Sequence, residues 1–154
     1  VKVIESKNNT AELPLDKICT QLYPNWEHDT NLVISPYKDV HELISEASVV
    51  CGVQSLTLLE SALVGLPVVV PFFDYFRKSA DGNRYAYERF LGLFDATGSV
   101  EEFKEKILWR LSDARIDVNT QRRREGVFSK EVCDLSGTAV ERTANLIRTL
   151  TQSG

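Results

Sequence analysis

The stretch "VVCGVQSLTLLESALVGLPVVVPFF" (residues 49–73) decides the fold. An apolar run leads into a turn of small polar residues, a helical pattern follows, and "GLPVVV" opens a second apolar run. Apolar runs that are continuous instead of alternating are typical of strands covered on both faces. The stretch therefore predicts a strand–helix–strand unit with parallel strands and a right-handed crossover.

Similar apolar runs and helical patterns extend this unit along the chain. The five strand-like runs are 1–5, 31–35, 48–53, 67–72 and 93–97. Two of the helical patterns between them begin with a capping residue and an acid three positions later, Asp39 with Glu42 and Ser99 with Glu102. We expect one Rossmann-like α/β domain over residues 1–154, with a parallel sheet of about five or six strands and helices on both faces. The run 48–53 is expected to be central in the sheet.

Two later segments complete the expected fold. The polar run "QRRRE" (121–125) is interpreted as an exposed helical face. The chain then closes with an amphipathic helix from about Thr138. We expect its apolar stripe to pack on the domain or, in a longer parent protein, to cross to the missing half. The residues of this stripe are Val140, Ala144, Ile147 and Leu150. The stripe of the helix that starts at Ser99 is Val100, Phe103, Ile107 and Leu111.

Composition limits the classes of function. The net charge is −4, which argues against a nucleic-acid surface, so any anion must be held locally. No apolar run approaches the roughly 18 residues of a membrane span. The three cysteines form no C-x-x-C pair, so we expect a reducing, cytoplasmic setting and no metal site. Because the chain has no Met and opens inside a strand-like run, we expect it to be a piece of a longer protein.

The turn "GVQSLT" (residues 52–57) is the candidate binding site. It follows a strand and opens a helix, where free N–H groups and the helix dipole favour a phosphate. Gly52 would let a ligand approach the backbone, and the Ser55 and Thr57 hydroxyls would donate to phosphate oxygens. Glu60 would accept hydrogen bonds from a ribose diol. A second interpretation stays open, because Thr57 and Glu60 also fit a T-x-x-E capping box that needs no ligand.

Two segments carry a resemblance to a known family. The stretch "DVHELISEASVVCGVQSLTLLESALVGLPVVVPFFD" and the tail "CDLSGTAVERTANLI" resemble the nucleotide-binding, C-terminal half of GT-B glycosyltransferases. They are most similar to bacterial surface-polysaccharide enzymes and CDP-glycerol glycerophosphotransferases. The resemblance covers roughly residues 31–150. It implies that Ser55 binds phosphate, that Glu60 holds the ribose, that Gln54 belongs to the donor-binding turn and that Tyr37 contacts the nucleoside.

This resemblance implies a function and leaves alternatives. The implied function is metal-independent transfer of a sugar or glycerol phosphate, in polysaccharide biosynthesis, from a nucleotide-activated donor to an acceptor, without a cofactor. The N-terminal acceptor domain, which usually supplies the catalytic base, is missing, so no catalytic residue is assigned. The segment "VIESKNNT" also lacks the His-Pro or basic motif of many relatives. A sugar-nucleotide epimerase of the UDP-GlcNAc 2-epimerase type and a non-catalytic interaction domain remain as alternatives, and the choice of UDP or CDP stays open.

Overall fold

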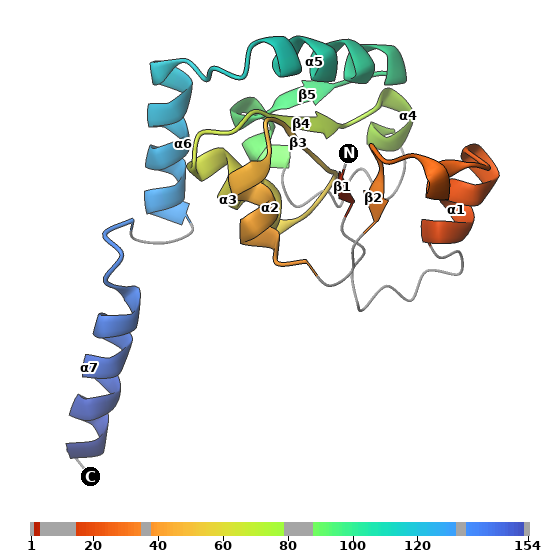
Figure 1. Ribbon diagram of the computed structural model, residues 1–154. Coiled ribbons are helices and arrows are strands. Elements are labelled where there is room, and N and C mark those ends of the chain that lie inside the picture. The colour runs from red at the N-terminus through yellow and green to blue at the C-terminus, as the bar shows by residue number, and fades with distance from the viewer. Residues whose placement is uncertain (1, 4–14, 35–37, 79–87, 132–134, 153–154) are drawn as a thin grey trace. The chain divides into compact units, whose positions relative to one another are not determined.

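The computed structural model describes residues 2–3, 15–34, 38–78, 88–131 and 135–152 (Figure 1). The chain divides into two compact units, Val1–Ala47 and Ser48–Gly154. Each unit contains its own small parallel sheet. None of the helices in the described ranges is long and apolar enough to span a membrane.

The first unit pairs two short strands in parallel. Its elements are β1 (Lys2–Val3), α1 (Leu15–Leu22), the 3-10 helix η1 (Trp26–His28), β2 (Val33–Ile34) and α2 (Val40–Glu46). Asp39 caps α2 as the sequence predicts, because its carboxylate accepts hydrogen bonds from the N–H groups of His41 and Glu42. These backbone donors favour the ionised form and lower the pKa of Asp39.

The second unit is a three-stranded parallel sheet with helices. Its elements are β3 (Val50–Cys51), α3 (Leu56–Leu63), β4 (Val68–Pro71), α4 (Asp74–Arg77), the 3-10 helix η3 (Glu88–Leu93), β5 (Asp95–Thr97), α5 (Val100–Ser112), α6 (Val118–Glu131) and α7 (Ala139–Gln152). The strand order is β3-β4-β5, and both pairs are parallel. The α/β class and the parallel pairing are confirmed. Within this described sheet the middle strand is β4, and β3, from the run 48–53, lies at its edge.

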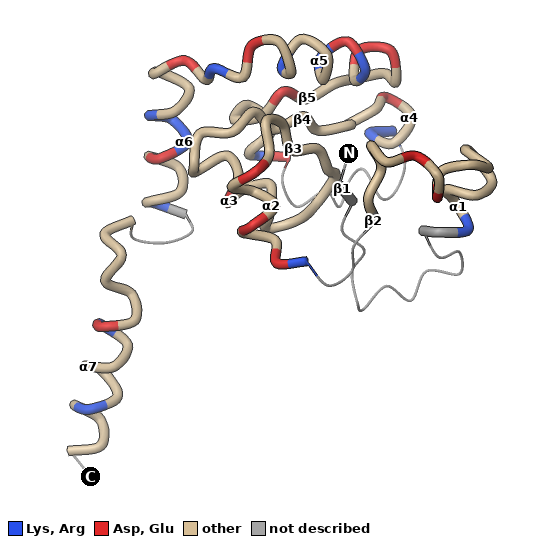
Figure 2. The backbone as a smooth tube through the Cα atoms, in the orientation of Figure 1, with Lys and Arg blue, Asp and Glu red and all other residues tan. Residues whose placement is uncertain are grey.

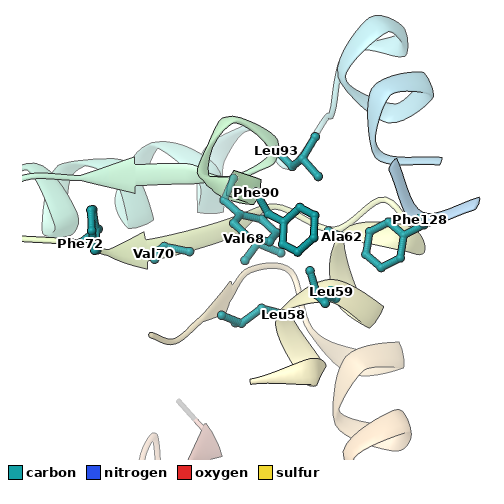
Figure 3. Packing of buried hydrophobic residues seen from close by; sticks show 10 residues of the cluster. Leu58, Leu59, Ala62, Val68, Val70, Phe72, Phe90, Leu93 and Phe128 are labelled. Atoms are coloured by element: carbon teal, nitrogen blue, oxygen red, sulfur yellow. The ribbon is translucent and has the colours of Figure 1, made fainter. Parts of the chain in front are cut away.

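Strand β4 is buried on both faces, which explains its continuous apolar sequence. Val68 and Val70 point into a core made with α3, η3 and α6 (Figure 3). Val69 is also fully buried, and successive side chains of a strand point to opposite faces. On that second face α5 packs against β4 and β5, and the rings of Phe73 and Phe103 meet edge to face at 6.0 Å between centroids.

Helix α5 begins where the sequence predicts, but only part of its stripe is covered. The N–H of Glu102 donates to Ser99 Oγ (3.1 Å), which confirms Ser99 as the N-cap. Phe103 and Ile107 are half-buried. The prediction was wrong for the two ends of the stripe, because Val100 and Leu111 are exposed and lie beyond the length of the short strands that α5 covers.

The dipeptide Gly65-Leu66 ends α3 and turns the chain into β4. The N–H of Leu66 donates to the carbonyl of Ser61 (3.0 Å), and the N–H of Gly65 donates to the carbonyl of Ala62 (3.2 Å). This pair of bonds is a Schellman motif, which needs a left-handed residue after the helix. Gly65 supplies it with a φ of 86°, which other residues rarely adopt.

Helix α6 packs against the C-terminal end of α3. The prediction that 121–125 is an exposed face was therefore wrong for Gln121 and Arg124, whereas Arg122, Arg123 and Glu125 are exposed. Arg124 is only 1% exposed and donates to three carbonyls, those of Leu93 (3.0 Å), Leu66 (2.9 Å) and Ala62 (3.2 Å). Gln121 donates to the carbonyl of Leu63 (2.9 Å). Burial lowers the pKa of Arg124. A cation at the C-terminus of α3 gives the carbonyls of Ala62 and Leu66 a charged donor and interacts favourably with the helix dipole.

Helix α7 has the predicted amphipathic sequence, but the prediction that its stripe docks on the domain was wrong for the described residues. Val140 is 82% exposed, Ile147 56% and Leu150 66%. No residue of this helix is fully buried, because no described element of the second unit covers its apolar stripe.

Candidate phosphate-binding site at the start of α3

The loop between β3 and α3 lies at the carboxyl edge of the sheet. In open parallel sheets ligands bind outside this edge. Cys51 ends β3, and Gly52, Val53, Gln54 and Ser55 then lead into the first residue of α3, Leu56. The loops that follow β4 and β5 leave the same edge and are joined by a hydrogen bond from the N–H of Asp74 to the carbonyl of Gly98 (2.9 Å).

Ser55, not Thr57, caps α3. The N–H of Thr57 donates to Ser55 Oγ at 3.2 Å, and Ser55 has the extended backbone (φ −156°, ψ 144°) of an N-cap residue. Thr57 is already the second residue of the helix, so the predicted capping box of Thr57 with Glu60 was wrong. The burial of Leu58 and Leu59 against β4 explains this register, because both lie in the first turn of the helix.

The first turn of α3 has donors for an anion. Among the described residues, the N–H groups of Gln54, Ser55 and Leu56 have no hydrogen-bond partner. Gln54, Ser55 and Leu56 are all exposed. A serine hydroxyl has one proton and two lone pairs, so Ser55 can accept from Thr57 and still donate its own proton outward. Capping and phosphate binding are therefore compatible at this residue.

Thr57 and Glu60 lie on one side of α3. Both are half-buried, and residues three apart on a helix are neighbours. Glu60 lies four residues after Leu56, which is about 6 Å along the helix axis. Its neighbours on this side, Leu56 and Val64, are 67% and 65% exposed. Glu60 therefore borders an open apolar surface, not the core.

Packing favours glycine at position 52, as does the proposed ligand. A Cβ atom at this position would lie 3.1 Å from Cδ2 of Leu58, whose side chain is only 2% exposed. The N–H of Gly52 donates to the carbonyl of Val69 at 3.4 Å, which continues the ladder between β3 and β4. Close contact with α3 thus gives a second reason for glycine at position 52.

The start of α5 shows by contrast what is distinctive at α3. The first turn of α5 contains Glu101 and Glu102, and the Glu102 carboxylate accepts from the N–H of Gly98 (2.7 Å). The protein's own anion therefore occupies that helix start. The first turn of α3 contains no acidic residue, and its cap is an uncharged hydroxyl. Of these two helix starts at the carboxyl edge, α3 is the one suited to an external anion.

The remaining sequence-based predictions for the site concern the nucleoside and metals. Tyr37, expected to contact the nucleoside, lies outside the described residues. The structure brings together Gly52, Gln54, Ser55, Thr57 and Glu60 at the start of α3. Over the described part of the chain there is no group of three or more His, Cys, Asp or Glu side chains that could hold a metal ion.

Comparison with known proteins found no relative of this chain. No protein-family model, curated protein or solved structure matches the chain. The resemblance to GT-B glycosyltransferases therefore rests on the residues quoted above.

Proposed function

We propose that the second unit binds the diphosphate of a nucleotide-activated donor at the N-terminus of α3. In this proposal the chain is the donor-binding half of a GT-B-type transferase that moves a sugar or glycerol phosphate to an acceptor. The observation that carries the proposal is an exposed helix start at the carboxyl edge of a parallel sheet. Its N–H groups have no partner among the described residues, and its first turn contains no acid.

Each residue of the candidate site has a proposed role. The N–H groups of Gln54, Ser55 and Leu56 and the Ser55 hydroxyl bind phosphate oxygens. Thr57 donates its hydroxyl to the same anion. Glu60, about 6 Å further along the helix axis, accepts from the ribose hydroxyls.

The site would aid the reaction by stabilising the leaving group. When the acceptor attacks, negative charge develops on the departing nucleotide, and donors fixed in advance toward that charge lower the barrier. No residue of the chain is assigned as the base that activates the acceptor. The proposal includes a Rossmann-like sheet of five or six strands and a separate acceptor domain that completes the cleft.

A screen of nucleotides by thermal unfolding tests the proposal. At 100 times its dissociation constant, a ligand adds about 2.7 kcal/mol to the free energy of unfolding. For a chain of this length that corresponds to a rise of about 8 °C in Tm. We expect diphosphates such as UDP or CDP to raise Tm and the matching nucleosides to leave it unchanged. Equal Tm values for all these compounds and for the free protein would contradict nucleotide binding.

An interaction domain without a ligand is a second candidate, favoured by one observation. The exposed apolar stripe of α7 is a surface on which another protein would pack. This candidate predicts that no nucleotide raises Tm, so the same screen separates it from the first.

A further inference from the structure

A second anion site is indicated at the opposite edge of the same sheet. A hollow of about 400 Å³ lies between η3 and α6, and we call it the η3–α6 pocket. Its cationic lining residues are Arg89, Arg123 and Lys130. None of the described residues that line it is acidic. The chain as a whole has a net charge of −4, and Figure 2 shows basic residues along α6.

The residues of α6 that line the pocket lie on one face of the helix. Arg123, Gly126, Val127 and Lys130 are spaced i, i+3, i+4 and i+7, which places them on one side of a helix. Arg123 donates to the carbonyl of Gly92 at 3.1 Å, which ties this face to η3. Lys130 is exposed, and its side chain makes no hydrogen bond or ion pair with the described residues.

Gly126 leaves room where a side chain would otherwise stand. A Cβ atom built there would meet nothing within 4 Å. Glycine in the middle of a helix is unfavourable relative to other residues, and no positive φ requires it at this position. Gly126 is exposed, so within the described structure no packing contact requires glycine there, and the surface between Arg123 and Lys130 is open to a bound group.

The wall of the pocket is apolar. Phe90 and Leu93 of η3 line it and belong to the hydrophobic core, and Val127 packs against that core (Figure 3). The guanidinium carbon of Arg89 lies 4.6 Å from the centroid of the Phe90 ring. Cations beside an apolar wall suit a ligand that has both a phosphate and a hydrophobic part. The volume is within the range of small-molecule sites.

We propose that the η3–α6 pocket binds a small phosphate monoester, with the phosphate between Arg123 and Lys130 and the apolar part against Phe90. The site is separate from the start of α3, because η3 precedes β5 and so lies at the amino edge of the sheet. It depends on no part of the proposed nucleotide site. Ligand binding at the η3–α6 pocket and nucleotide binding at the start of α3 can therefore be tested independently.

Titration calorimetry of the full chain with phenyl phosphate tests the pocket. The variant Lys130→Gln removes one charged hydrogen bond to the phosphate, so it should bind phenyl phosphate about tenfold or more weakly than the unaltered chain. Arg122→Gln is the matched control, because it loses the same charge from α6 at a residue that does not line the pocket. Inorganic phosphate should bind more weakly than phenyl phosphate, since it lacks the apolar part.

A second variant tests the pocket without changing charge. Gly126→Leu should fill the open space and abolish binding, while the helix keeps or gains stability in thermal unfolding. Ser55→Asp, at the other edge of the sheet, should leave the affinity for phenyl phosphate unchanged. The proposal is overturned by any of three results: no binding by the unaltered chain, equal losses in Lys130→Gln and Arg122→Gln, or full affinity in Gly126→Leu.

Discussion

Replacing Ser55 by Asp and by Asn separates the capping role of this residue from phosphate binding. Asp and Asn have nearly the same shape and cap helices about as well as Ser. We therefore expect both variants to keep the unfolding free energy of the unaltered protein within a few tenths of a kcal/mol. Ser55→Ala, which loses the bond to the N–H of Thr57, should cost about 1 kcal/mol.

The two variants should differ sharply in affinity for a nucleoside diphosphate. A phosphate on the N–H groups of Ser55 and Leu56 would lie about 5 Å from a carboxylate at position 55. Two unit charges at that distance repel by about 1 kcal/mol in water and by about 3 kcal/mol at a protein surface. Taking about 2 kcal/mol, Ser55→Asp should bind UDP or CDP about thirtyfold more weakly than Ser55→Asn.

Affinity is read by titration calorimetry, and stability by denaturant unfolding of the same preparations. The comparison depends only on charge, because the Asp and Asn side chains fill the same space. Equal affinities of the two variants for the diphosphate would refute the placement of a phosphate at the start of α3.

Four further predictions concern the site and the fold. Glu60→Gln should weaken binding of ribonucleotides more than that of their 2′-deoxy forms in the same titrations, and equal losses would remove Glu60 from the ribose. Arg124→Met should destabilise the chain by about 3 kcal/mol in denaturant unfolding, because three carbonyls each lose a charged donor, whereas the exposed Arg122→Met should change little. Gly65→Ala should cost about 1 kcal/mol in the same assay, because φ is 86°, and an unchanged midpoint would contradict the Schellman ending of α3. Two side-chain hydrogen bonds from Arg115 (each 2.8 Å) help to lower the pKa of Asp113 to about 2. The contribution of the Asp113 carboxylate to the free energy of unfolding is therefore present above pH 4 and is lost as the pH falls toward 2. Asp113→Asn should flatten the curve of stability against pH in that range.

The strand–helix–strand unit could be predicted because its signals are local. The continuous apolar run of β4 reflects burial on both faces, and Gly65 marks the helix end. Strand β3, at the edge of the described sheet, is less buried than its apolar run suggests, because Val50 is half-buried and Cys51 is exposed. The register of the cap was harder to predict. Ser55 and Thr57 are two hydroxyl residues in one short turn, and either could cap the helix. The burial of Leu58 and Leu59 makes Ser55 the cap, and the sequence of the turn alone does not show that burial.

The errors in α6 and α7 come from contacts distant in sequence. Three successive arginines on α6 look alike in the sequence, and Arg124 is distinguished as the buried one by carbonyls distant in sequence, those of Ala62, Leu66 and Leu93. An amphipathic pattern shows that α7 has an apolar stripe, but it cannot show which surface covers that stripe. The basic face of α6 was missed for the same reason, since Arg89 reaches the pocket from another element.

Amide NMR of the ¹⁵N-labelled chain during titration with UDP, CDP and their nucleosides tests the central claim most directly. The amide resonances of Gln54, Ser55 and Leu56 should move with added diphosphate and saturate. The nucleosides should leave these three resonances unchanged. Diphosphate titrations that do not move them, or that move only resonances elsewhere in the chain, would contradict phosphate binding at the N-terminus of α3.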